Sequence, residues 1–123
     1  MIYDGRKMAN KVWQKVLCIC GEQLRRDKGL HVHICGYENG REHGLHVSHS
    51  SMGTDICFSE NRNSDSLVVY FGQSHDFEMA GGVPTEKVWE NRVFFRPDEM
   101  DKAAKAIAAW LVHGTPIHFE ERA

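Results

Sequence analysis

Histidines gathered in one short stretch are the first residues of this chain whose types could do chemistry. The chain has eight histidines, and five of them lie close together, namely His31, His33, His43, His46 and His49. The sequence Gly-Leu-His-Val also occurs twice, at residues 29–32 and 44–47. Imidazole rings bind transition metals and transfer protons near neutral pH. The stretch could therefore form a metal site, an acid–base site or the polar face of a sheet.

Alternating side chains around these histidines predict two strands. Apolar residues alternate with other residues over 30–35 and again over 44–50, which is typical of strands with one apolar face. Between them, Asn39-Gly40 is a turn signal. We therefore expect an antiparallel hairpin whose leucines and valines face the core and whose histidines face away from it.

The register of this hairpin decides which histidines can meet. If both apolar faces lie on the same side, His33 lies opposite His46 and His31 lies opposite Ser48. Directly opposed side chains have Cβ atoms about 5 Å apart. A catalytic zinc site usually has three protein ligands and a structural one four, so a further ligand would have to be His31, His43 or a residue from elsewhere. Because this ligand set is incomplete and no HExxH, Cys-x-x-Cys or EF-hand pattern occurs, we expect no metal and no other cofactor.

Signatures of covalent catalysis are missing from the sequence. Cys35 shares a strand face with His33, but the spacing specifies neither an activating environment for the thiol nor a third group that orients the base. Nucleophile-elbow, Walker and dinucleotide-binding glycine patterns do not occur. We therefore expect that the protein is not an enzyme, and we assign no catalytic residue.

A second group of residues has the chemistry of ligand binding. A polar loop at 59–66 and the segment 75–96 interleave aromatic residues with asparagine and arginine. Aromatic rings stack on bases, arginine grips phosphate with two hydrogen bonds, and asparagine reads base edges. The predicted ligand-binding residues are Arg62, Phe77, Trp89, Asn91, Arg92 and Arg96. The alternative is that the large aromatic residues are core and that the arginines are surface charges.

The remaining elements follow from periodicity. Helical spacing of apolar residues predicts a helix over 7–27 and a second one over 97–113, and strands are expected at 54–60 and 66–72. The later strand is a nearly continuous apolar run, which is typical of a central strand. Residues 87–96 begin like a short helix and end like a strand. Consecutive strands between two helices predict an α+β fold, in which an antiparallel sheet of about four to five strands is flanked by an N-terminal and a C-terminal helix.

Length and charge bound the function further. The 123 residues suggest one α+β domain over 1–123. A formal net charge of −2 argues against binding of long nucleic acid. No apolar run is long enough to span a membrane, and the first residues lack the apolar segment of a signal peptide. We expect a cytoplasmic protein whose four cysteines are free thiols.

The order of elements resembles a known family over residues 64–112. The stretches that carry the resemblance are NSDSLVVYFG, DFEM, PTEKVWENRVFF and DEMDKAAKAIAAWL. Their arrangement is similar to that of small phage-encoded proteins of the Thoeris anti-defence type, which counter bacterial defence by sequestering a signalling nucleotide. The resemblance implies a non-enzymatic homo-oligomer in the host cytoplasm. It would bind a cyclic ADP-ribose isomer, or cyclic oligonucleotides, at or near subunit interfaces without cleaving the ligand.

Three functions are therefore expected, in decreasing order of support. The first is a binding protein that sequesters a small phosphorylated nucleotide-type signal and so counters an anti-phage defence. The second is a protein–protein inhibitor or adaptor that docks through an acidic surface patch formed by Glu99, Asp101, Glu120 and Glu121. The third is a metal-binding module or metal-dependent hydrolase that uses His31, His33 and His46.

Overall fold

A computed structural model of the chain describes residues 4–36, 43–61, 66–80 and 83–117. The elements of this part, in chain order, are α1 (Asp4–Arg25), β1 (Leu30–Gly36), β2 (His43–His49), β3 (Thr54–Asn61), β4 (Ser66–Gln73), η2 (Ser74–Asp76), β5 (Met79–Ala80), β6 (Val83–Pro84), η3 (Glu86–Asn91), β7 (Arg92–Phe95), η4 (Pro97–Glu99) and α2 (Met100–His113). The elements named η are short 3₁₀ helices.

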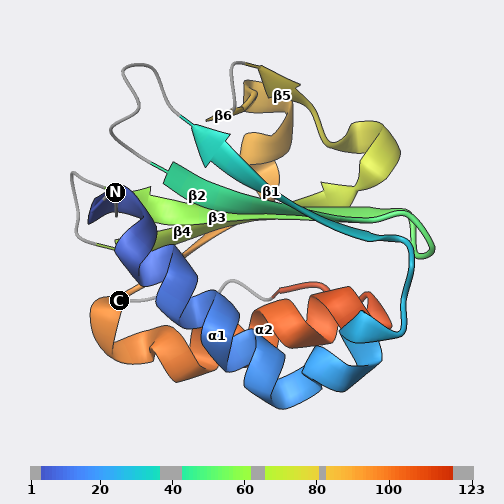
Figure 1. The fold of residues 1–123 in the computed structure, drawn as a ribbon. Coiled ribbons are helices and arrows are strands. Elements are labelled where there is room, and N and C mark those ends of the chain that lie inside the picture. The colour runs from blue at the N-terminus through green and yellow to red at the C-terminus, as the bar shows by residue number, and fades with distance from the viewer. Residues whose placement is uncertain (1–3, 37–42, 62–65, 81–82, 118–123) are drawn as a thin grey trace.

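An antiparallel sheet lies at the centre of the fold. Its five strands have the order β1-β2-β3-β4-β7, and every neighbouring pair is antiparallel. The helices α1 and α2 cover one face of this sheet, whereas β5, β6 and η3 lie over the other face (Figure 1). We call these the inner and the outer face of the sheet. This architecture confirms the predicted α+β fold with flanking N-terminal and C-terminal helices.

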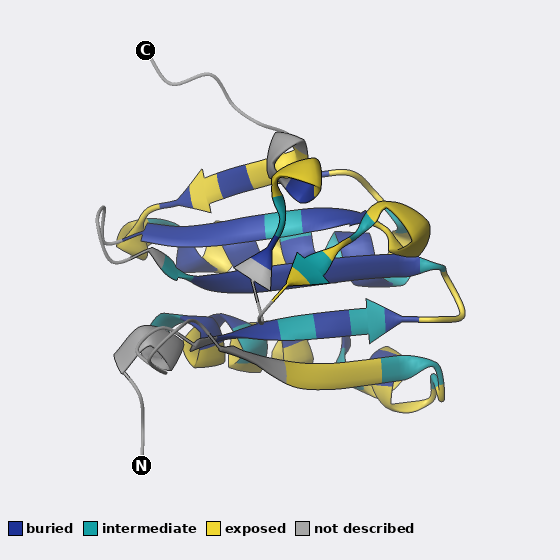
Figure 2. Cartoon of the chain, turned by 90° about the horizontal axis from the view of Figure 1, so that it is seen from above, coloured by how far each residue is buried: buried dark blue, intermediate teal, exposed yellow. Residues whose placement is uncertain are grey.

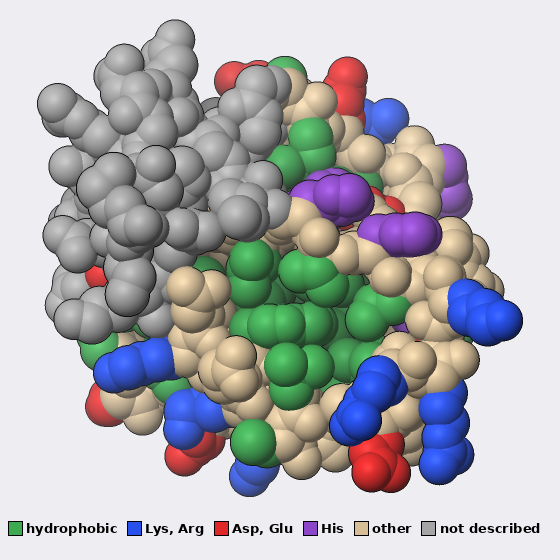
Figure 3. Space-filling model, in the orientation of Figure 1, with side chains coloured by type: hydrophobic (Ala, Val, Ile, Leu, Met, Phe, Trp, Pro, Cys, Tyr) green, Lys and Arg blue, Asp and Glu red, His purple; other side chains and the backbone are tan. Residues whose placement is uncertain are grey.

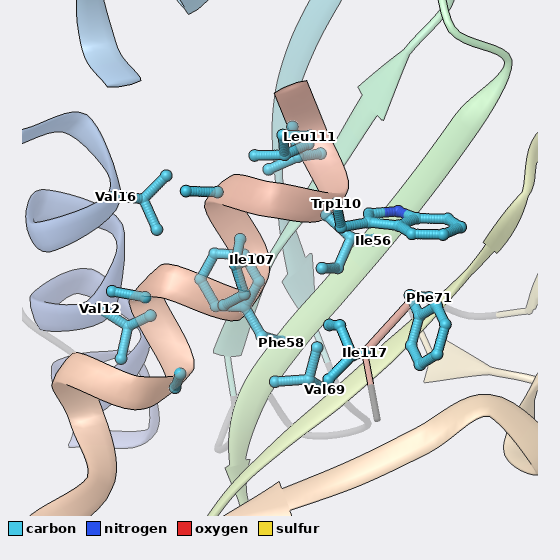
Figure 4. Close-up of a cluster of buried hydrophobic side chains, with 14 of the residues drawn as sticks. Val12, Val16, Ile56, Phe58, Val69, Phe71, Ile107, Trp110, Leu111 and Ile117 are labelled. Atoms are coloured by element: carbon cyan, nitrogen blue, oxygen red, sulfur yellow. The ribbon is translucent and has the colours of Figure 1, made fainter. Parts of the chain in front are cut away.

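The hydrophobic core fills the space between the two helices and the inner face (Figure 4). Val12 and Val16 are four residues apart on α1, as are Ile107 and Leu111 on α2, so each pair points to one side of its helix. All four side chains are fully buried, as is Phe58 of β3. Burying a side chain of this kind stabilises the fold by about 1.5–3 kcal/mol. Neither helix of the described part is long and apolar enough to span a membrane.

The predicted hairpin register is confirmed. His33 lies opposite His46, His31 lies opposite Ser48, and Val32 lies opposite Val47. Because side chains alternate between the two faces of a strand, the three histidines share the outer face. Val47 on the inner face is completely buried. The phase of the apolar residues is thus what set the pairing.

Burial falls from the centre of the sheet toward the β1 edge (Figure 2). On β4 every residue is buried except the half-buried Tyr70 and the exposed Gln73, which confirms the prediction of a central strand covered on both faces. At the edge, by contrast, Val32 of β1 is 44% exposed although it belongs to the inner face. The helices therefore cover the inner face completely at its centre and only partly at β1.

Three predicted elements differ in detail from the observed ones. The first helix begins three residues earlier than predicted and ends at Arg25. Residues 87–96 contain both a short helix and a strand, because η3 ends at Asn91 and β7 follows directly. The predicted C-terminal helix starts with the separate 3₁₀ turn η4. It ends as expected at Gly114, whose φ of 67° is favoured by glycine and whose N–H donates to the Trp110 carbonyl at 2.9 Å.

Candidate functional site

Polar and aromatic side chains collect on the outer face because the strand registers align them. One row of directly paired residues crosses all five strands and consists of His33, His46, Cys57, Tyr70 and Arg92. The neighbouring row contains His31, Ser48, Asp55 and Gly72. The alternation that buries the apolar half of each strand against the helices therefore presents these residues together on the other side.

Four rings form a connected series over β1, β2 and the segment after η2. The ring centroids of His31 and His33 are 6.4 Å apart, and the two rings are stacked. His33 and His46 follow at 6.2 Å, and His46 stacks on Phe77 at 5.3 Å with an interplanar angle of 17°. We call these four residues, together with Ser48, Asp55 and Ser74, the histidine face.

Asp55 on β3 fixes the position of the His46 ring. The Nε2–H of His46 donates to Asp55 Oδ2 at 2.7 Å, and the Ser48 hydroxyl donates to the same oxygen at 2.9 Å. Ser74 follows the last residue of β4, and its hydroxyl donates to Asp55 Oδ1 at 2.5 Å. Three donors therefore hold a carboxylate that is only 8% exposed.

The hydrogen bonds to Asp55 also set its charge. Burial of the carboxyl group works to raise its pKa, but the hydrogen bonds from His46, Ser74 and Ser48 outweigh burial, and the net pKa lies below the ordinary value. Asp55 is therefore a carboxylate at neutral pH. It can only accept hydrogen bonds in this state, so the Asp55 bond keeps a proton on the Nε2 atom of His46.

The histidine face is open on one side and closed on the other. His31 and His33 on the edge strand are exposed, and the His46 side chain retains an exposed fraction of 18%. Toward β3 and β4 the face is closed, since Cys57 is 1% exposed. A ligand could thus reach the rings from the β1 side, where Figure 3 shows histidine side chains beside a hydrophobic area.

Two of the predicted ligand-binding residues share the outer face. Phe77 belongs to the histidine face through its stacking on His46. Arg92 lies at the far end of the register row that starts with His33 and His46. Its guanidinium group is 5.7 Å from the centroid of the Phe94 ring. Buried Cys57 and half-buried Tyr70 lie between His46 and Arg92 in that row. Both predicted residues are therefore on one face but at different positions along it.

Asn91 and Arg96 are not part of the histidine face. Asn91 is exposed at the end of η3. Arg96 forms ion pairs with Asp98 at 3.4 Å and with Glu99 at 3.6 Å. Its charge is therefore paired with two carboxylates of η4, directly before α2. Arg62 and the side chain of Trp89 lie outside the described residues.

His49 has a structural role and does not belong to the histidine face. It is 4% exposed on the inner side of the sheet. Its Nδ1–H donates to the carbonyl of Leu111 at 2.9 Å, and its Nε2 atom is hydrogen bonded to Asp27. Asp27 also accepts from the Gly29 N–H and the Ser51 hydroxyl, each at 2.8 Å. This polar cluster joins the residues after α1 to β2 and to the C-terminal end of α2.

The cluster around Asp27 predicts a loss of stability in acid. Hydrogen bonds from His49, Gly29 and Ser51 lower the pKa of Asp27 to about 2. A carboxylate with a lowered pKa stabilises the fold above its ordinary pKa, and this stabilisation is lost as the pH falls through the folded-state value. In urea unfolding, Asp27→Asn should therefore be less stable than the parent at pH 7, and the difference should shrink between pH 4 and pH 2.

Asp76→Asn is the matched control, since this carboxylate is on the surface, with a side chain 63% exposed. Its unfolding midpoint should follow that of the parent protein across the same pH range. A difference between Asp27→Asn and the parent that stays constant down to pH 2 would contradict the assignment.

Several of these residues were missed by sequence reasoning, although one signal was present. His49 has the same strand phase as Leu45 and Val47, so parity alone places it on the core side, where a polar ring needs partners. Asp55 alternates with the buried Ile56 and could be assigned to the outer face in the same way. The hydrogen bond from Ser74 to Asp55 cannot be predicted from strand phase, because it depends on how the chain turns after β4.

The histidine face is a surface of neighbouring rings in which Asp55 fixes the orientation of the His46 ring. It offers stacked rings, imidazole nitrogens near solvent and a buried carboxylate that keeps His46 in place. Among the described residues, no three potential metal ligands already converge on one point. Comparisons with protein-family models, with curated proteins and with solved structures find no match to this chain.

Proposed function

We propose that the protein binds a small phosphorylated, nucleotide-type ligand on the histidine face and holds it without chemical change. The observation that supports this proposal is the series of ring contacts from His31 through His33 and His46 to Phe77, in which the first and last pairs are stacked and the middle pair is tilted by 47°. Bound tightly, the ligand would be withdrawn from solution, which is the action of a sponge. The resemblance over residues 64–112 makes a cyclic ADP-ribose isomer the first ligand to test, with an anti-phage defence as the system that it would counter.

Stacking supplies the first part of the proposed affinity. Every base has a flat π-face, and the stacking of one base on an aromatic side chain contributes about 1–3 kcal/mol. Phe77 and His46 are nearly parallel, so they form a preordered surface. The hydrogen bond between His46 and Asp55 holds this ring in place before any ligand arrives, which reduces the entropic cost of binding.

Imidazole rings supply the second part, which is attraction for phosphate. Histidine can carry a positive charge near neutral pH, and a charged N–H forms a strong hydrogen bond with a phosphate oxygen. His31 and His33 are exposed beside the oriented His46. A phosphate group could therefore lie over β1 while its base stacks nearer to Phe77.

Calorimetric titration with a panel of nucleotides tests the proposal. The panel should contain cyclic ADP-ribose isomers, cyclic dinucleotides, ADP-ribose and ATP, and at least one of them should bind. Phe77→Ala should weaken that binding by about 5- to 150-fold, because a lost stack of about 1–3 kcal/mol corresponds to that range. If none of these nucleotides binds, the proposal is wrong.

Phe94→Ala is the matched control for the titration. Phe94 is also an aromatic residue of the outer face, and it is 37% exposed, but it lies on β7 at the far edge of the sheet. Its removal should leave the affinity unchanged. Equal losses in the Phe77 and Phe94 variants would place the ligand elsewhere.

The bound ligand must also be recovered intact. After heat denaturation of the complex, mass spectrometry of the supernatant should return the unmodified nucleotide in the amount that was bound. Recovery of a degraded product would show that the protein is an enzyme, with His46 and Asp55 as the first residues to examine.

A protein-docking function is the second candidate, and the exposed edge of the sheet favours it. Val32 is 44% exposed on the edge strand. On α1, Leu17 and Ile19 are also exposed, at 37% and 52%, but Ile19 lines the groove between α1 and α2 and not the sheet edge. The acidic patch predicted for docking has less support. Asp101 pairs with Lys15 at 2.7 Å, and Glu99 pairs with Arg96, while the two C-terminal glutamates lie outside the described residues. A docking partner would therefore be held by apolar contacts.

A further inference from the structure

Three imidazoles of the histidine face have the arrangement from which a metal site can be built. His31 and His33 are two residues apart on one strand, so both side chains lie on the same face. His46 lies directly opposite His33 on the neighbouring strand. The ring centroids are 6.4 Å and 6.2 Å apart along this series. Three ring nitrogens would meet in front of the sheet only after the exposed rings change rotamer, because no three possible ligands of the described residues converge as they are placed.

The second observation is the buried carboxylate behind His46. Histidines that bind metals almost always donate their other ring N–H to a carboxylate, a carbonyl or water, which fixes the ring and makes the ligating nitrogen more basic. His46 donates its Nε2–H to Asp55, and Asp55 is itself held by Ser48 and Ser74. A metal would therefore be bound through Nδ1 of His46.

We propose that His31, His33 and His46 bind one divalent transition-metal ion of the zinc class, with Asp55 as the residue that orients His46. Imidazole suits zinc, nickel, copper and iron. Zinc is bound by histidine nitrogen at about 2.0–2.1 Å and accepts three histidines and one further ligand. The fourth position would hold water or an oxygen of an anion.

The rings must turn to reach this geometry, and the structure shows which of them can. Among the described residues, no three potential ligands converge as they are placed. His31 and His33 are exposed on the edge strand, and exposed side chains change rotamer within picoseconds to nanoseconds. His46 keeps its hydrogen bond to Asp55, so the two exposed rings would have to turn toward its Nδ1 atom. The site is therefore one fixed ligand with two adjustable ones.

The incomplete ligand set argued against a metal when only the sequence was considered. The structure adds the carboxylate partner of His46, which no spacing in the sequence indicates. This proposal does not depend on nucleotide binding, because its probe is the metal ion alone.

Titration of the chelator-treated protein, without a histidine tag, with Zn²⁺ tests the proposal. We expect one Zn²⁺ per chain by calorimetry. With Co²⁺ we expect the strong visible absorption of a four-coordinate site. His33→Ala should abolish stoichiometric binding, and Asp55→Asn should weaken it by about 10–100-fold, as is usual for the hydrogen-bond partner of a ligand.

His75→Ala is the control, since His75 is an exposed histidine outside the series, with a side chain 78% exposed. It should bind one Zn²⁺ like the parent. His31 and His33 are exposed, so their variants should stay folded, which circular dichroism would verify. Absence of binding to the parent, or equal binding by His33→Ala and the parent, would overturn the proposal. Nucleotide titration in the presence of chelator keeps the two proposals separate, because it tests the ligand without metal.

Discussion

Replacement of Trp110 by alanine is expected to lower the free energy of unfolding by about 3–5 kcal/mol. The Trp110 side chain is 3% exposed and packs edge-on against Phe71, with ring centroids 5.0 Å apart. Its Nε1–H donates to the backbone carbonyl of Asp55 at 3.1 Å. The variant would leave a large cavity and a buried carbonyl without its donor, and both are costly. Urea unfolding followed by circular dichroism measures the loss.

Two further variants separate the causes of this loss. Trp110→Phe keeps most of the ring volume and removes the donor, so it should cost less, about 1–3 kcal/mol. Phe94→Ala removes an aromatic side chain that is 37% exposed and should cost clearly less than Trp110→Ala, about 1 kcal/mol. A loss below 1 kcal/mol in Trp110→Ala would mean that α2 does not pack on the sheet as described. Domains of this size are stable by only about 5–15 kcal/mol, so this helix contact is a large part of the total.

The second large effect is expected at Asp55. Asp55→Ala removes the acceptor of three side chains, namely His46, Ser48 and Ser74. Breaking a buried pair on one side typically costs about 3–5 kcal/mol, because the remaining partner is left without compensation. Since the His46 side chain keeps an exposed fraction of 18%, water can replace part of the loss. We therefore expect about 2–3 kcal/mol in urea unfolding at pH 7.

The pH dependence of Asp55→Ala provides the check. The pKa of Asp55 is lowered in the folded protein, so its contribution is present above the ordinary aspartate pKa and is lost as the pH falls below that value. The stability difference from the parent should narrow in acid. Asp98→Ala removes a carboxylate whose side chain is 76% exposed and should behave like the parent at neutral pH. An Asp55 variant as stable as the parent at pH 7 would contradict the role of this residue as the anchor of His46.

The hairpin could be predicted because one physical rule decides it. Only one register of residues 30–35 and 44–50 puts both apolar faces on the core side, and that register is the one observed. The C-terminal helix could also be predicted, because its apolar residues recur at helical spacing. The apolar residues of this helix are buried from Met100 to Leu111. Both elements have a period that extends over several residues, and such patterns are the most reliable ones.

Residues 87–96 could not be resolved because two short elements share ten residues. Val88 is buried within η3, and four residues later a strand with its own alternation begins, with Val93 and Phe95 buried. Neither period repeats often enough in so short a segment to be recognised. The chain changes from η3 to β7 where it pairs with β4. This pairing is a tertiary contact, which local sequence does not reveal.

The candidate site could be predicted only in part. Strand phase placed His31, His33 and His46 on one face, and residue chemistry selected Phe77, which stacks on that group. The link between Asp55 and His46 depends on the β2–β3 register, and the Ser74 contact depends on the path of the chain after β4. Side-chain partners that come from three separate elements leave no pattern of spacing along the chain.

The packing of α1 against α2 has a consequence for the order in which the chain can fold during synthesis. The helices cover the inner face side by side, and Lys15 pairs with Asp101 across 86 positions of sequence. The hydrophobic surface of α1 and of the first strands therefore emerges from the ribosome long before its partner helix. Until residues 100–113 are synthesised, the part of this surface that α2 covers stays exposed. Completion of the fold should thus coincide with release of the C-terminal helix, and a chaperone that shields apolar surface would act before that moment.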